Sequence, residues 1–114
     1  MANTFRKKTS KAIGTALTQI GSYAVPSSTQ TTVIGMSVSN VTTSSVDVDI
    51  ALSATMANTT NDISLGTSIP LPAGSSVVIV GGDQKLVMET SDLIKVKSTA
   101  ASSVDVCMSL LEIT

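Results

Sequence analysis

Apolar and polar residues alternate with a period of two along much of this 114-residue chain. Apolar side chains occupy every second position in four runs, at residues 34–38, 46–52, 94–97 and 104–110. Because successive side chains of a β-strand point to opposite faces, each run predicts a strand with one buried and one solvated face. Segments rich in Pro, Gly, Ser and Thr separate the runs. The pattern predicts an all-β domain, built as an antiparallel β-sandwich or a small barrel.

Two segments depart from this alternation. "SSVVIVGG" (75–82) places four apolar residues together, which predicts a strand covered on both faces, by the second sheet and by a neighbouring subunit. "ATMANTTNDISLGTS" (54–68) has the weakest pattern, and we expect a long exposed loop there with one weak strand.

Nearly the same nine residues occur twice, as "SSVDVDIAL" (44–52) and "SSVDVCMSL" (102–110). One reading is a duplicated site with Asp47 and Asp105 as paired carboxylates. The other reading is structural: each copy follows a strand and a short Ser/Thr turn, so each is predicted to be the return strand of a hairpin. The valines would then face the core and the aspartates would face water, which also discourages edge-to-edge pairing of strands.

The charges are unevenly distributed, although the formal net charge is only -1. No acidic residue precedes Asp47, whereas the first residues are basic. This asymmetry predicts a basic N-terminal arm at residues 1–12 and a β-sandwich domain at residues 13–114. The arm either docks on an acidic protein surface, with an aromatic residue as its apolar anchor, or is a solvated tail. Its partner-binding candidates are Phe5, Arg6, Lys7, Lys8 and Lys11.

Nucleic acid fits this arm poorly. Lys and Arg side chains can contact phosphates, but single-strand binding also needs aromatic platforms, and the chain has one Phe, one Tyr and no Trp. No run approaches the ~20 apolar residues of a membrane span. We therefore expect neither a nucleic acid nor a membrane as partner.

The composition argues against an enzyme, a metal or a cofactor. The chain has no His and a single Cys, so a Ser nucleophile would lack an imidazole base and no Cys/His metal set can form. Asp47 and Asp49 share a strand face at roughly 6.5–7 Å. Such a spacing fits a hydrolase pair or half of a calcium site, but nothing supplies further ligands. Solvated charge is the preferred interpretation, and Cys107 is interpreted as an inert outward thiol.

"GGDQK" (81–85) is rich in glycine but lacks the spacing of a phosphate-binding loop and a following helix. A hairpin turn is the simplest interpretation. Its polar side chains are candidates for lateral contacts between copies of the chain. These candidates are Asp83, Gln84 and Lys85.

Taken in order, "YAVPSSTQTTVIG" (23–35), "PLPAGSS" (70–76) and "LVMETSDLIKV" (86–96) resemble small virion structural proteins of tailed phages, especially marine and cyanobacterial phages. The resemblance extends from Ala2 to Ile113. It implies an Ig-like or jelly-roll-like sandwich that serves as a capsid decoration protein or a neck or tail accessory protein. It also implies a homo-oligomer that contacts other virion proteins, in a particle assembled in the host cytoplasm, with no catalytic residue.

The alternative is a receptor- or glycan-binding sandwich on a phage fibre or host surface, with residues 54–68 as its contact loop. The scarcity of aromatic residues argues against a sugar-binding surface, because such surfaces usually present flat apolar platforms to the sugar ring.

Overall fold

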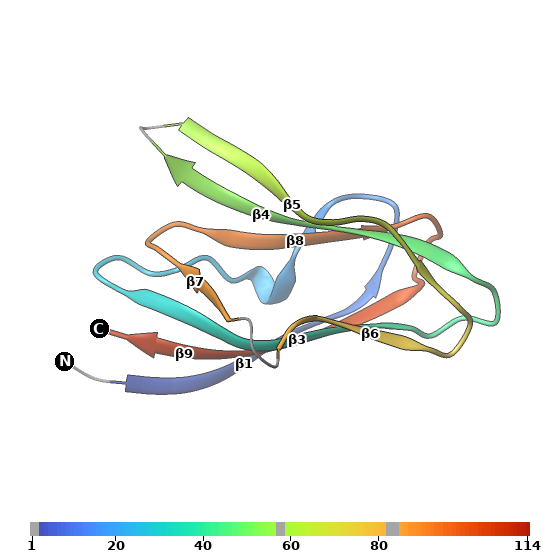
Figure 1. Cartoon of the computed structure of the whole chain (residues 1–114), viewed down its shortest axis with the longest axis horizontal. Helices are drawn as coiled ribbons and strands as arrows, with labels where there is room; N and C mark the ends of the chain where they lie inside the picture. Colours follow the sequence, from blue (N-terminus) through green and yellow to red (C-terminus); the bar gives the residue numbers. More distant parts are fainter. Residues whose placement is uncertain (1–2, 57–58, 82–84) are drawn as a thin grey trace.

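Two antiparallel β-sheets pack face to face in the computed structural model (Figure 1), which describes residues 3–56, 59–81 and 85–114. Sheet A has the strand order β1-β9-β3-β6, with β7 also pairing with β3. Sheet B has the order β2-β8-β4-β5. A short 3-10 helix, η1 (Ile20–Ser22), follows β2. The strands are β1 (Asn3–Ile13), β2 (Thr18–Gln19), β3 (Gln30–Asn40), β4 (Val46–Met56), β5 (Thr59–Leu71), β6 (Ser76–Val80), β7 (Leu86–Met88), β8 (Leu93–Ser98) and β9 (Val104–Ile113).

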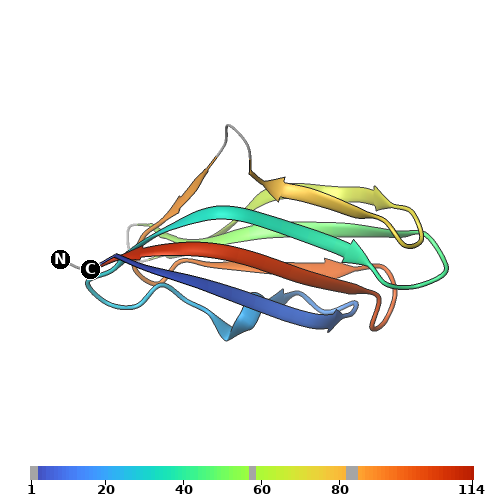
Figure 2. The same cartoon turned by 90° about the horizontal axis from the view of Figure 1, so that it is seen from below.

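Strands β6 and β7 lie end to end along β3 and together form one edge of sheet A, with β1 at the other edge (Figure 2). Counting β6 and β7 as one position, each sheet has four strands. Along the chain, successive strands counted in this way alternate between sheet A and sheet B, except that β4 and β5 are neighbours in sheet B. This order is that of a jelly roll, the architecture in which two four-stranded sheets enclose one core. The predicted all-β antiparallel sandwich is confirmed.

The alternation of the sequence decides which side chains fill the core. In β9, every second residue from Val104 to Leu110 is buried, and in β4 Val46, Val48 and Ile50 are buried. The two copies of the repeat thus supply equivalent valines from opposite sheets, Val48 and Val106. The predicted faces of the repeat are confirmed, because the valines are buried and Asp47 and Asp105 face outward.

The prediction that each copy is the return strand of a hairpin is wrong. β3 and β4 lie in different sheets, and so do β8 and β9. Each Ser/Thr turn crosses the sandwich instead, and buried polar side chains satisfy its carbonyl groups. In the first turn, Asn40 Nδ2 donates to the Ser44 carbonyl at 2.8 Å and also to the Leu71 carbonyl at the end of β5 at 2.9 Å. In the second turn, Ser103 Oγ donates to the Ala100 carbonyl at 2.8 Å.

A register shift in β3 changes the expected inner residues. The pairing of β3 with β9 slips between Val33 and Gly35, so that Ile34 is an extra residue. Such a bulge reverses the phase of the alternation. Val33 is therefore fully buried, Met36 remains inside, and Ile34 is only partly buried.

Strand β6 is an edge strand that sheet B covers on one face: Val80 is buried, whereas Val78 is 67% exposed. The expected cover of the other face by a neighbouring subunit stays a prediction. The long exposed loop expected within residues 54–68 is wrong for the described part of this segment: residues 54–56 belong to β4 and residues 59–68 to β5, and the two strands pair from Val46–Leu71 to Met56–Thr59. The Thr, Asn and Ser residues of this segment are tolerated in an edge strand, so the polar composition hides the hairpin.

The N-terminal segment is extended, as expected, but it is joined to the sandwich. β1 pairs with β9 from Asn3–Ile113 to Ser10–Val106, so the ladder links Asn3–Ser10 of the predicted arm to the predicted domain at 13–114. The hairpin predicted at 81–85 is also wrong, because β6 and β7 both pair with β3 rather than with each other. Asp83 and Gln84 lie outside the described residues.

Candidate functional site

The two outer faces of the sandwich differ in chemistry. Sheet B carries ion pairs on its outer face: Lys97 lies 3.7 Å from Asp49, and Lys95 lies 4.0 Å from Asp62. Asp49 also accepts a hydrogen bond of 2.6 Å from the Ser68 backbone N–H. Cross-strand pairs of this kind are typical of a solvated sheet surface.

The proposed carboxylate pair of Asp47 and Asp49 does not form a site. Asp47 is exposed, and Asp49 is engaged with Lys97 and the Ser68 backbone. Within residues 3–56, 59–81 and 85–114, no group of three or more His, Cys, Asp or Glu side chains is placed to hold a metal ion. In the same residues, no helix has the length and hydropathy of a bilayer span.

Sheet A presents a different outer face, crossed by one row of large side chains. The strand register places Phe5 beside Leu111, Leu111 beside Thr32, and Thr32 beside Val87. We call these four residues the cross-strand row. Phe5 is 75% exposed and Val87 is 63% exposed. Exposed apolar residues that gather in this way commonly mark an interaction surface.

Next to the cross-strand row, the face is hollowed because its side chains are small. Gly35, Ser37, Cys107 and Ser109 line a shallow depression of about 290 Å³, which Val78 borders on β6. A second depression of about 260 Å³ shares Ser37 and Cys107 and reaches the β1 edge. Two charged side chains, Lys11 and Asp105, are among the residues that line this second depression. Cys107 is a free, exposed thiol, as the alternation predicts.

The basic residues of β1 divide between the two sides of the strand. Phe5 pairs with Leu111 and Lys7 with Ser109, so both lie on the outer face. Lys11 lines the second depression on this same face. The other two candidates turn inward, because their partners on β9 face the core. These inward residues are Arg6, opposite Leu110, and Lys8, opposite Met108.

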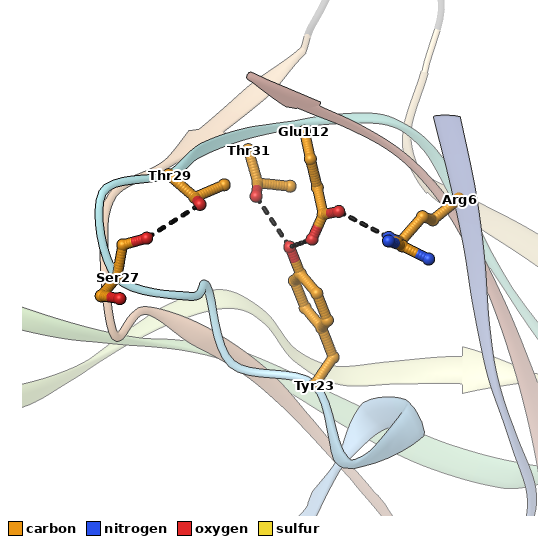
Figure 3. Close-up of polar contacts among 6 residues, drawn as sticks. All are labelled: Arg6, Tyr23, Ser27, Thr29, Thr31 and Glu112. Carbon is orange, nitrogen blue, oxygen red and sulfur yellow. Dashed lines mark hydrogen bonds and ion pairs between the residues drawn. The ribbon is translucent and has the colours of Figure 1, made fainter. Parts of the chain in front are cut away.

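Arg6 joins a polar cluster that Glu112 of β9, Thr31 of β3 and Tyr23, just after η1, form beside β1 (Figure 3). Arg6 Nε donates to Glu112 Oε1 at 2.5 Å, and the Tyr23 hydroxyl donates to Glu112 Oε2 at 2.7 Å. The Tyr23 hydroxyl also lies 2.8 Å from Thr31 Oγ1. Lys8 places its ammonium group 5.5 Å from the centroid of the Tyr23 ring. The cluster therefore fastens β1 to the sandwich through polar contacts.

The cluster perturbs two ionisations. Burial is the largest cause that raises the pKa of Tyr23 to about 12, and the neighbouring Glu112 carboxylate adds to it. Burial alone would also raise the pKa of Glu112. Hydrogen bonds from Arg6 and Tyr23, with the charges of Arg6 and Lys8, outweigh burial and leave this pKa below its ordinary value. Glu112 is therefore an ionised, buried anchor for β1.

The alternation of the sequence does not predict this cluster, although one signal of it is present. Extending the period of two in β9 beyond Leu110 places Glu112 on the inner face, where a carboxylate needs a partner. The partner is Arg6, 106 residues away in the chain. No local pattern identifies a pair at that separation.

No protein-family model and no curated protein sequence matches the chain. Among solved structures, it is similar to a protein of Bacillus endospore appendages described as disulfide-linked pili, with 18% identity and a TM-score of 0.51 over 96% of this chain and 85% of that one. It is also similar to the infectious bursal disease virus particle protein, with 11% identity and a TM-score of 0.52 over 96% of this chain. The chain spans 30% of the viral protein's length. At these identities, the likeness shows the fold alone.

Proposed function

We propose that this chain is a non-enzymatic structural subunit of a virion, and that its setting is a tailed-phage particle assembled in the host cytoplasm. The position we favour is that of a capsid decoration protein or a neck or tail accessory protein. Its fold supports a structural role, since the two similar structures come from a viral particle and from pili. Its partners in this proposal are copies of itself and other virion proteins, and it needs no cofactor.

The single observation that carries this proposal is the difference between the two outer faces. Sheet B carries the ion pairs of a solvated surface, whereas sheet A exposes Phe5, Val78 and Val87 around a floor of small side chains. Burying a large apolar side chain contributes about 1.5–3 kcal/mol. An exposed row of them beside an uncharged, hollowed floor is therefore suited to contact with another protein.

The N-terminal residues have two roles in this proposal. Phe5, Lys7 and Lys11 contact a neighbouring protein with an acidic surface, since they lie on the outer face of sheet A or at its rim. Arg6 and Lys8 hold β1 in register through Glu112 and Tyr23, and so act on the partner only through the strand. The two groups predict different mutant behaviour.

Lateral contacts by Asp83, Gln84 and Lys85 remain part of the proposal. Lys85 is exposed and directly precedes β7, which carries Val87 of the cross-strand row. A contact at Lys85 would therefore continue the same surface.

Mass spectrometry of purified phage particles, with copy-number quantification, tests the proposal. We expect the chain at a fixed copy number per particle. A variant carrying Val87→Asp should fold normally but remain in the particle-free fraction, because the new charge lies in the cross-strand row. Finding the wild-type chain only in the particle-free fraction, or bound as a monomer to a glycan or host receptor, would refute the structural role.

A further inference from the structure

We propose that the first part of β1, Asn3–Ser10, exchanges between copies of this chain, so that it pairs with β9 of a second copy in the assembly. This inference rests on the proposed function, because it names a second copy as the partner that β1 reaches. The occupant of the β9 edge is then the same segment from another molecule.

First, Asn3–Ser10 contributes almost nothing to the hydrophobic core. Six of these eight residues are exposed, and only Lys8 and Ser10 are partly buried. The first buried apolar residue of β1 is Ile13, which lies beyond the segment. The segment supplies no member of the hydrophobic core, although its Lys8 lies over the ring of one core residue, Tyr23. The two sheets therefore do not need this particular copy of the segment.

Second, the contacts that hold the segment are specific and polar. They are the ladder with β9, the pair of Arg6 with Glu112, the Lys8 ammonium over the Tyr23 ring, and a 2.7 Å hydrogen bond from the Gly21 backbone N–H to Ser10 Oγ. An identical segment from another copy offers the same groups in the same register. Exchange therefore preserves every contact, as in domain swapping.

This specificity is also the reason for choosing a second copy as the occupant. Glu112 is a buried carboxylate, so the strand that pairs with this end of β9 must bring a cation to it in register. Arg6 meets that requirement, and this chain carries it. A foreign strand without such a cation would leave Glu112 without its ion-pair partner.

Third, the structure contains a hinge at the correct place. The β1–β9 ladder is regular through Ser10–Val106 and then shifts before Ile13–Val104. Within this break, Ala12 has a φ of 58°. That left-handed conformation is unfavourable for alanine, and the other non-glycine residues with positive φ in the described chain are all serines. An extended Ala12 would release the strain and direct Asn3–Ser10 away from its own sheet.

The residues beyond the hinge are fixed to the sandwich. Ser103 donates its backbone N–H to the Ile13 carbonyl at 2.9 Å, and Ser98 donates its backbone N–H to the Gly14 carbonyl at 2.8 Å. The chain is thus anchored by backbone hydrogen bonds on one side of Ala12. On the other side it is held by the ladder with β9 and by polar side-chain contacts, and the Ala12 N–H itself donates to Asp105 Oδ1 at 2.9 Å. Rotation at Ala12 moves the segment without disturbing the anchor.

The register supplies a direct test, because Thr9 lies opposite Cys107, the only cysteine of the chain. Thr9→Cys places two thiols on paired residues of adjacent strands, a separation that a disulfide can span. Equal amounts of unlabelled and ¹⁵N-labelled Thr9→Cys chains are mixed while reduced, concentrated to assembly and then oxidised. Mass spectrometry of the proteolysed product identifies the peptide that joins position 9 to Cys107.

We expect some of these cross-linked peptides to join one labelled half to one unlabelled half. Their share should approach the share given by random pairing of labelled and unlabelled chains. Only uniformly labelled and uniformly unlabelled peptides would show that each strand stays on its own sheet, and would overturn the proposal. The matched control is Lys7→Cys, whose register partner is Ser109, and which should give far less cross-link to Cys107. An equal mixed yield from Lys7→Cys would mean random collision of thiols and would also count against exchange.

Two substitutions at the hinge sharpen the result. Ala12→Gly removes the strain at positive φ and should lower the mixed share. Ala12→Pro excludes positive φ and also removes the N–H that donates to Asp105 Oδ1, so it should raise the mixed share. If neither moves the share, Ala12 is not the hinge and the mechanism fails. Absence of mixed peptide from a chain that is still found in purified particles would refute exchange and leave the proposed function standing.

Discussion

Val78 and Val80 of β6 lie on opposite faces of sheet A, because the pairing of β6 with β3 shifts between them. Aspartate at each of these two positions gives the sharpest test of the sandwich. Val80 is 5% exposed and belongs to the core, whereas Val78 is 67% exposed on the outer face of sheet A. Val80→Asp forfeits about 1.5–3 kcal/mol of apolar burial. Burying a carboxylate without a partner costs several kcal/mol more. The sum approaches the whole stability of a small domain, about 5–15 kcal/mol.

Val78→Asp should behave differently. Two thirds of this side chain already contacts water, so the lost burial is worth only about 0.5–1 kcal/mol. The new carboxylate remains solvated. We therefore expect near-native unfolding for Val78→Asp and a largely unfolded Val80→Asp, with Val78→Thr as a matched control of similar size.

Urea unfolding followed by circular dichroism measures both values, and light scattering at high concentration measures assembly. Val78→Asp should keep its free energy of unfolding while losing assembly, because it places a charge beside the small-residue depression. Equal destabilisation by the two substitutions would mean that β6 is covered on both faces within one chain. Equal tolerance would mean that Val80 is not in the core.

Four further predictions follow from the polar cluster, the edge strand and the acidic residues of sheet B. The ionised Glu112 stabilises the fold fully above its ordinary pKa of 4.5, and this contribution is lost as the pH falls through its lower folded-state pKa. Glu112→Gln should cost about 1.5–3 kcal/mol at neutral pH. It should also weaken the fall of the unfolding temperature with decreasing pH. Because the pKa of Tyr23 is raised from 10.0 to about 12, neutral Tyr23 contributes stability that is fully present below pH 10 and lost as the pH rises through 12. Tyr23→Phe should remove this loss of stability at alkaline pH. If the variant loses stability at alkaline pH as the wild type does, the buried neutral Tyr23 is not its cause. Deleting residues 1–12 should leave a domain that still unfolds cooperatively, at a lower temperature, but is missing from particles; its incorporation at normal copy number would exclude a docking role for β1. Replacing Asp47 and Asp49 together by Asn should change stability by no more than about 1 kcal/mol and leave assembly intact, as expected for an exposed charge and a weak surface ion pair. Loss of a measurable hydrolytic activity would reopen the enzyme hypothesis.

The sequence alone determined the class of fold and most of the buried residues. A period of two requires strands, and in β9 and β4 the same period separates Val106 and Val48 from Asp105 and Asp47. It also placed Cys107 outside. These features are local, because the direction of each side chain depends only on its position along its own strand.

The tertiary structure alone decided which strands are neighbours. A short Ser/Thr turn after β3 or β8 suits a hairpin and a crossing between sheets equally well, so the sequence could not place β4 and β9 in opposite sheets. The bulge at Ile34 and the exposed face of β6 were hidden for the same reason, since both depend on the strand that lies alongside. Arg6 and Glu112 stand at opposite ends of the chain, and only closure of sheet A by β1 makes them partners. Alternation fixes the face of a side chain, whereas pairing is chosen by the long-range packing of the whole sandwich.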